Sequence, residues 1–462
     1  SLQQLQQEMQ RLKQERATQQ EEVTRRVMEV EKKAADAAAS SLQTGFAPWP
    51  GKGFYLKSAD GQHRLNIGGY VQTLAQVEAA RNEEQVAAAD KTAAIGRHRP
   101  STLKLQRVRV IFDGTVYRDF GFHIEPEFVA GNIGARIETG FVSYTYAPWA
   151  KVTVGQMRHQ YGLEEGMATQ DLDFAAQRSF VVRALAPDLQ MGVLLSGNSR
   201  LADMPVYYGV GIFNGCGRVD QCPGSIDNDG EKEYTGRVTV TPPMPMGNLT
   251  VGLNGDFRTF NVVRGNGATD TNGVTVPVGG ASTFHRFNPL STLGDKFGGD
   301  GKGTSQNGFL INGDRVTTGA DFVFDLYPFT LKGEFHYAAQ DRDGLGAGGS
   351  NLNDLRMMGG YGTIGYWVMG NKLKGLLVNG RYEHLRVDNV GGGFTPAAGT
   401  NEHNLRVRAG TLGLTWYANP NVFVRANYLL TDVTPGRNIV GVSNVTQGEL
   451  AHQGIAELMV RF

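Results

Sequence analysis

The residues of this chain best suited to covalent chemistry are its two cysteines, in the segment NGCGRVDQCPGS. Gly, Asp and Pro surround Cys216 and Cys222, so we expect both to lie in a loop. A metal site would need further ligands nearby, and none appear. A catalytic thiol would need a basic partner, which a bonded pair does not. The sequence therefore predicts a disulfide between the two cysteines, which implies an oxidising compartment.

Other chemistry-bearing patterns argue against catalysis. The sequence contains no G-x-S-x-G elbow, no phosphate-cradling G-x-x-x-x-G-K loop and no C-x-x-C pair. His98 and His159 are interpreted as surface residues or residues of a wet interior rather than as metal ligands. We expect no catalytic residue, no metal site and no cofactor, so an enzyme is the least favoured function considered.

Composition excludes two further classes. The formal net charge is 0 at pH 7, which argues against nucleic acid as the main partner. No run of about 18 apolar residues occurs, so no transmembrane helix is expected. The first residues, SLQQLQQEMQ, do not have the pattern of a signal peptide, so the chain is either cytosolic or numbered from after signal cleavage.

Residues 1–40 are predicted to form a helix, because they are rich in Gln, Glu, Arg and Ala and lack Gly and Pro. Apolar residues follow a spacing of three and four, with a stutter at Arg16 and Gln19. The seam consists of Leu2, Leu5, Met9, Leu12, Val23, Val27, Val30, Ala34 and Ala37. We favour a self-associating coiled coil over an amphipathic helix packed on its own chain. Residues 41–62 are interpreted as a linker.

From residue 63 onward the apolar period becomes two. In LQRVRVIFDG, for example, Val108, Val110 and Phe112 alternate with Arg107 and Arg109. Such alternation predicts antiparallel strands with one charged face. A soluble sandwich is the alternative, but its inner faces would be apolar.

Strand length and connection length favour a membrane barrel over that sandwich. We predict about sixteen strands of about ten residues, close to the length that a tilted strand needs to cross a bilayer. Short and long connections alternate, except at 130–135, and aromatic residues cluster at strand ends. The predicted fold is a closed all-β transmembrane barrel over residues 63–462, with 449–462 as the closing strand and Phe462 as a terminal aromatic.

Several stretches carry a family resemblance. They include FYLKSADGQHRLNIGGYVQ, LKLQRVRVIFDGTV, VTVGQMRHQYGLEE, GYGTIGYWVMGNKLKG and LGLTWYANPNVFVRANY. In this order, from about residue 54 to 462, the chain resembles the phosphate-selective porins O and P. The resemblance implies homotrimers of sixteen-stranded barrels. It also implies that the third long loop, here about 159–190, folds inward and narrows the pore.

The resemblance further implies a pore lined by arginines and a lysine cluster. The candidate pore-lining residues are Arg107, Arg109, Arg381, Arg406, Arg408 and Arg425 on strands, and Arg178 and Arg183 on the inward loop. Guanidinium groups suit passing phosphate or carboxylate groups. The alternative is that these arginines solvate the lumen or pair with Glu125, Glu127, Glu334 or Glu383. Strand lysines are sparse, so we expect a modest anion preference.

We therefore predict a porin in the outer membrane of a Gram-negative-type bacterium, surrounded by outer-membrane lipids. Small hydrophilic solutes would diffuse through it passively, with a preference for anions such as phosphate. The alternative function is a structural anchor, in which the helix lies in the periplasm and tethers the membrane to peptidoglycan or another periplasmic partner.

Overall fold

The computed structural model describes most of the chain. The described residues are 2–40, 42–46, 53–80, 101–129, 134–175, 178–215, 231–260, 285–287, 309–344, 351–389, 404–434 and 449–462. Cys216 and Cys222 lie outside these ranges, so their disulfide stays a prediction.

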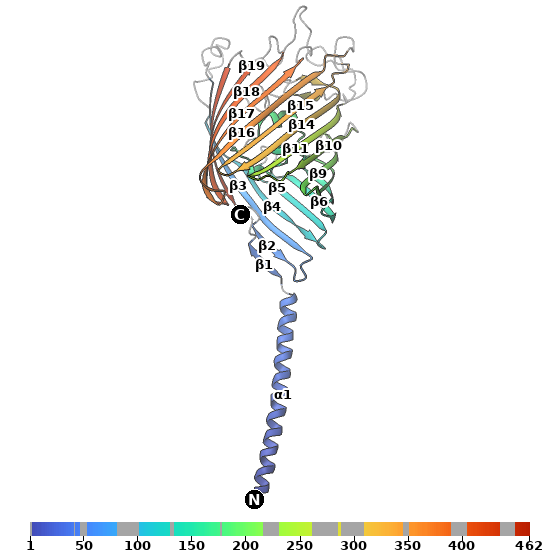
Figure 1. Cartoon of the computed structure of the whole chain (residues 1–462), viewed down its shortest axis with the longest axis vertical. Coiled ribbons are helices and arrows are strands. Elements are labelled where there is room, and N and C mark those ends of the chain that lie inside the picture. The colour runs from blue at the N-terminus through green and yellow to red at the C-terminus, as the bar shows by residue number, and fades with distance from the viewer. Residues whose placement is uncertain are drawn as a thin grey trace, which may run out of the picture.

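Sixteen of the described strands form one closed antiparallel barrel (Figure 1). In chain order they are β3 (Arg64–Ala80), β4 (Ser101–Val116), β5 (Phe120–Glu127), β6 (Arg136–Ala147), β7 (Ala150–Met157), β8 (Gln190–Leu201), β9 (Met204–Phe213), β10 (Glu233–Val240), β11 (Asn248–Phe260), β14 (Gly313–Leu326), β15 (Phe329–Gln340), β16 (Leu355–Asn371), β17 (Lys374–Asp388), β18 (Leu405–Asn419), β19 (Val422–Thr434) and β20 (Glu449–Arg461). Each strand pairs with its neighbour in this order. The predicted number of barrel strands is confirmed.

The barrel closes where β20 pairs with both β19 and β3. The β20–β3 register runs from Ala451 opposite Ala80 to Arg461 opposite Tyr70. The backbones of Phe462 and Gly69 then exchange two hydrogen bonds of 3.0 Å. Closure removes the free edges that an open sheet would expose to lipid.

Two short strands lie within residues 41–62, which we expected to be a linker. They are β1 (Gln43–Phe46) and β2 (Phe54–Lys57), which pair with each other. β2 also pairs with residues Arg64–Ile67 of β3, beyond the end of β20. The hairpin therefore extends the wall beside the first strand of the barrel (Figure 1).

Side chains along the strands alternate between lumen and membrane. On β18, Thr411 and Thr415 are buried, whereas Leu412, Leu414 and Trp416 are exposed on the opposite face. Exposed apolar side chains on the outer wall, with polar side chains inside, are the pattern of a barrel that faces lipid.

The helix α1 (Leu2–Ser40) spans 39 residues and extends away from the barrel (Figure 1). Three ion pairs at i,i+4 support it: Arg11–Glu15, Glu22–Arg26 and Glu29–Lys33. The seam residues Met9, Val23, Val27 and Val30 are all exposed. The predicted helix is confirmed, and its self-association stays a prediction.

No helix in the described ranges is both long and apolar enough to cross a membrane.

The remaining described elements are small. They are α3 (Leu163–Gly166), the 3-10 helix η2 (Thr169–Asp171) and α4 (Phe180–Leu185), all between β7 and β8, and the strand pair β12 (His285–Phe287) and β13 (Phe309–Ile311).

Candidate functional site

The connection between β7 and β8 crosses the barrel interior. The Leu163 amide in this connection donates to Glu334 Oε1 on β15, at 3.1 Å. The Ala175 amide donates to Asn427 Oδ1 on β19, at 3.3 Å. Because β15 and β19 lie far from β7 and β8 in the strand order, the connection must span the lumen. We call residues 158–189 the inward loop.

The helix α4 packs the inward loop against the inner wall. Phe180, Val181 and Leu185 of α4 form one buried cluster with wall residues that include Leu385 and Leu405. Side chains that face water in an open pore are usually polar, but here the inner wall is apolar because α4 covers it. At this height the usual pattern of a polar lumen and an apolar outside is therefore reversed.

This reversal changes the position of two predicted pore-lining residues. Arg406 and Arg408 are exposed, whereas Leu405, Val407 and Ala409 between and beside them are buried beneath α4. Both arginines therefore point out of the barrel, on the face that carries Leu412, Leu414 and Trp416. The prediction that Arg406 and Arg408 line the lumen is wrong. At this height the charged side chains of β18 lie on the outer face of the barrel, beyond the apolar residues that contact the membrane.

Arg381 on β17 connects the inward loop to the wall. Its Nη1 lies 2.9 Å from Glu164 Oε1 on the loop, and its Nε lies 2.7 Å from Glu383 Oε1 on the wall. Glu383 Oε2 also accepts hydrogen bonds from the Ser179 hydroxyl at 2.6 Å and from the Phe180 amide at 2.9 Å. All three charged side chains are at most 5% exposed. This buried arrangement fixes the loop in one position.

We call these contacts between Arg381, Glu383 and the inward loop the anchor. It also includes the wall carboxylate of Glu334 and the loop carboxylate of Glu164. Glu334 accepts the amide hydrogen bonds of Leu163 and Glu164, each at 3.1 Å, and that of the Tyr361 hydroxyl at 2.9 Å. Glu164 Oε2 accepts the Ser179 amide at 2.5 Å. Burial raises the pKa of the Glu164 carboxyl to about 7, although the charge of Arg381 opposes that shift.

Arg178 and Arg425 also hold the loop. Arg178 donates to the carbonyl oxygens of Glu164 at 3.0 Å and of Met167 at 2.6 Å. Arg425 Nη1 lies 3.2 Å from Glu457 Oε1, and its Nη2 donates to the carbonyl oxygen of Gln170 at 3.3 Å. These guanidinium groups are bound to the protein itself, which leaves them little capacity to bind a solute.

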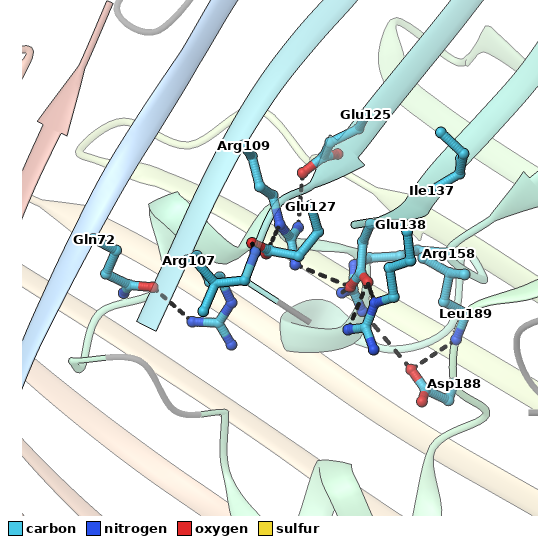
Figure 2. Close-up of polar contacts among 12 residues, drawn as sticks. Gln72, Arg107, Arg109, Glu125, Glu127, Ile137, Glu138, Arg158, Asp188 and Leu189 are labelled. Carbon is cyan, nitrogen blue, oxygen red and sulfur yellow. Dashed lines mark hydrogen bonds and ion pairs between the residues drawn. The ribbon is translucent and has the colours of Figure 1, made fainter. Parts of the chain in front are cut away.

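A second charged cluster lines the wall next to the loop (Figure 2). Arg109 on β4 contacts Glu125 at 2.7 Å, Glu127 at 2.6 Å and Glu138 at 3.0 Å. Its side chain is 5% exposed. Three carboxylates around one guanidinium group give this part of the wall a negative rather than a positive balance.

Arg158 and Arg136 restore that balance. Arg158 lies 3.5 Å from Glu138 and 2.8 Å from Glu165, so it joins the wall to the inward loop. Arg136 lies 3.0 Å from the other oxygen of Glu138. Figure 2 shows Glu138 between Arg109 and Arg158. The sequence analysis did not identify Arg158 and Glu138 as site residues. A signal was present, because Arg136 and Glu138 are two positions apart and so share one face of a predicted strand.

Arg107 differs from the other inward arginines. Within the described residues, its only polar side-chain contact is with the neutral amide of Gln72, with Nη1 donating to Oε1 at 2.7 Å. Figure 2 shows its guanidinium group away from the carboxylates that surround Arg109. The Arg107 residue is partly exposed within the described part of the chain.

Like the acidic residues Asp171 and Asp188, Arg183 is an exposed charged residue of the inward loop. It is the exposed residue of α4, whose remaining residues Phe180, Val181, Val182, Ala184 and Leu185 are buried. Since α4 lies on the inner wall, its exposed side faces the lumen.

A closed barrel with a polar lumen and an inward loop defines an outer-membrane channel for small solutes. The sequence model described as phosphate-selective porin O and P matches residues 80–442, and the chain belongs to this family. No curated protein sequence matches the chain.

Solved structures of other porins share the fold. OmpT of Vibrio cholerae, folded in vitro, has a TM-score of 0.50 at 11% identity, with 87% of this chain and 98% of that chain covered. An anion-selective porin from Comamonas acidovorans has a TM-score of 0.50 at 13% identity, with 87% and 100% covered. At these identities the similarity establishes the architecture alone.

Proposed function

We propose that this channel carries small hydrophilic solutes by passive diffusion and prefers anions modestly. The observation behind the proposal is the contrast between Arg107 and the other inward arginines. Arg109, Arg381 and Arg425 are paired with wall carboxylates, whereas Arg107 has a neutral partner. Its positive charge therefore acts on the solutes that pass.

The size of this effect follows from Coulomb attraction in a wet pore. A unit charge about 6 Å from a passing anion contributes about 0.7 kcal/mol in a medium as polar as water, and about 3 kcal/mol at an effective dielectric constant near 20. A water-filled lumen lies near the first value, which corresponds to about a threefold preference. Strict selection of phosphate would need several unpaired cations in series. The described lumen contains Lys332, but that lysine lies 2.8 Å from Asp173 on the loop.

The test is a reversal-potential measurement on the purified protein in a planar bilayer under a KCl gradient. Replacing Arg107 by Ala should lower the chloride-to-potassium permeability ratio by about threefold. R107K should retain most of the ratio, because the charge remains. R200A is the matched control, since Arg200 is exposed at the end of β8. An unchanged ratio in R107A would refute the role given to this arginine.

We further infer a homotrimer in which three α1 helices associate in parallel on the periplasmic side. Support comes from the exposed seam residues Met9, Val23, Val27 and Val30, which have apolar surface to bury. α1 also leaves the barrel at the end that carries the short turns, and short turns are periplasmic in barrels of this class (Figure 1). Whether the helix also binds the cell wall stays a separate prediction.

A further inference from the structure

The outer wall carries a group of arginines that the channel function does not use. Arg386 on β17 lies directly opposite Arg406 on β18, and His384 lies opposite Arg408. We call Arg386, Arg406 and Arg408 the outer arginine cluster. Directly opposed side chains on one face of a sheet have Cβ atoms about 5 Å apart, and like charges in that position repel. Such an arrangement is destabilising, and an anion between the cations would relieve the repulsion.

The protein supplies few of those anions. Arg386 Nε lies 2.6 Å from Asp388 Oδ1 on the same strand. Asp432 on β19 is the register partner of Arg408 but forms no ion pair with it. Among the residues that the structure describes, Arg406 and Arg408 make neither a hydrogen bond nor an ion pair. Within the described part of the chain, three arginines face two aspartates, and only one of the three guanidinium groups has an ion pair.

The height of the cluster on the wall indicates which anions reach it. Below the cluster, β18 presents Leu412, Leu414 and Trp416 to the membrane, all of them exposed. Eight residues separate Trp416 from Arg408, which is about 26 Å along the strand and about 20 Å along the membrane normal at a tilt near 40°. Since the apolar band of such barrels is about 25 Å tall, the cluster lies at its upper edge.

Aromatic side chains mark the same boundary. Tyr382, two residues below His384 on β17, is 59% exposed on the outer face. Tyr428 on β19 is 46% exposed, and its hydroxyl lies 2.6 Å from His452 Nδ1. Tyrosines of this kind occupy the level of the lipid head groups. The cluster is at the end of the wall that carries the long connection between β17 and β18, which is the external end in this class.

We propose that the outer arginine cluster binds the phosphate groups of lipids in the external leaflet. A guanidinium group matches phosphate with two parallel hydrogen bonds, and a phosphate between Arg406 and Arg386 would relieve their repulsion. The band of leucine, tyrosine and tryptophan below the cluster would contact the acyl chains of the same lipid. The site is independent of the lumen and of the anion preference proposed above.

Native mass spectrometry of the detergent-purified full chain tests the proposal, with diphosphorylated lipid A as the probe and phosphatidylcholine as the zwitterionic comparison. R406A/R408A should bind lipid A about 25-fold more weakly, at about fivefold for each basic residue near an anionic surface. Binding of phosphatidylcholine should not change. K372A/K374A is the matched control, because both lysines are exposed at the other end of the same wall.

Three results would overturn the proposal. The first is equal retention of lipid A by R406A/R408A and the unmodified chain. The second is an equal loss in K372A/K374A, which would show that any surface cation serves. The third is dissociation of oligomers in R406A/R408A with lipid retention unchanged, which would make this face a contact between copies. Both arginines are exposed, so heat-modifiable gel mobility should confirm that the variant barrels are folded.

Discussion

Replacing Arg381 by Ala should release the inward loop and widen the pore. Arg381 is the cation between Glu164 on the loop and Glu383 on the wall, at 2.9 and 2.7 Å. The two carboxylates are 5% and 2% exposed, so removing the arginine leaves them buried without their counter-charge. Breaking a buried ion pair on one side destabilises by about 3–5 kcal/mol. The equilibrium between docked and undocked loop should therefore shift by a factor of about 10² to 10³ or more.

The assay combines single-channel conductance in planar bilayers with limited proteolysis of residues 158–189. We expect R381A to conduct more, with larger current fluctuations, and to be cleaved in this segment faster than the unmodified protein. R183A is the control for loss of a positive charge on the same loop, because Arg183 is the exposed residue of α4, whereas the ion pairs of the anchor join Arg381 to Glu164 and Glu383. Removing both partners should restore docking, since neutral groups carry no unpaired charge, so R381M/E164Q/E383Q should behave more like the unmodified chain.

Acidity should reduce the effect. Burial already holds the pKa of Glu164 at about 7, and loss of Arg381 would raise it further. At pH 5 Glu164 is then neutral in R381A, and part of the electrostatic destabilisation disappears. If R381A keeps the conductance and protease resistance of the unmodified protein at pH 8, the anchor is not what holds the loop.

Three further outcomes are expected. Burial raises the pKa of Glu164 from about 4.3 in an unfolded chain to about 7, so its contribution to stability is complete below about pH 4.3 and is lost as pH rises through 7. The unfolding temperature should therefore fall across this pH range, and it should fall less in E164Q. An equal fall in E164Q and in the unmodified protein would contradict this. Cys216 and Cys222 should resist alkylation until reduced, which mass spectrometry can check; labelling of both without reductant would exclude their disulfide. Deleting residues 1–40 should leave a folded barrel but lower the temperature at which oligomers dissociate in gels, and unchanged dissociation would exclude the seam as a contact.

The strands were predictable because a barrel wall imposes one local rule on many residues. Alternation around Arg107 and Arg109 identified β4, and the same rule located every barrel strand among the described residues. The rule failed at Arg406 and Arg408 for a physical reason. Alternation with a period of two separates the two faces of a strand but does not show which face is inside. The prediction assigned the charged face to the lumen. Here α4 covers the inner wall with apolar contacts, so charge marks the outside.

The partners of the lumen arginines could not be read from the sequence. Glu164 and Arg381 are separated by 217 positions along the chain, and only the closed barrel brings them together. The family resemblance placed the loop inside the pore, yet it gave no register between loop and wall. Pairing with Glu125, Glu127, Glu334 or Glu383 was the alternative considered for these arginines. The structure places Glu125, Glu127 and Glu383 in ion pairs with arginines. The basic side chain that contacts Glu334 among the described residues is His336, at 2.9 Å.

The pairing also indicates how the channel's selectivity could be changed. Glu138 lies within 3.0 Å of both Arg109 and Arg136 and within 3.5 Å of Arg158, so one carboxylate serves three cations. Adding an arginine to this wall would add charge that the existing carboxylates largely neutralise. E138Q keeps the size of the side chain and removes one negative charge, which exposes the field of the three guanidinium groups to the lumen.

We therefore expect E138Q to raise the chloride-to-potassium permeability ratio, by an amount similar to the threefold decrease expected for R107A but in the opposite direction. Reversal potentials in a KCl gradient measure it, and E29Q on the exposed helix α1 is the control for a general loss of one negative charge. The conductance must stay near that of the unmodified protein, because a displaced loop would change selectivity by another route. A shift toward cations, at normal conductance, would show that Glu138 does not neutralise the arginines that solutes meet.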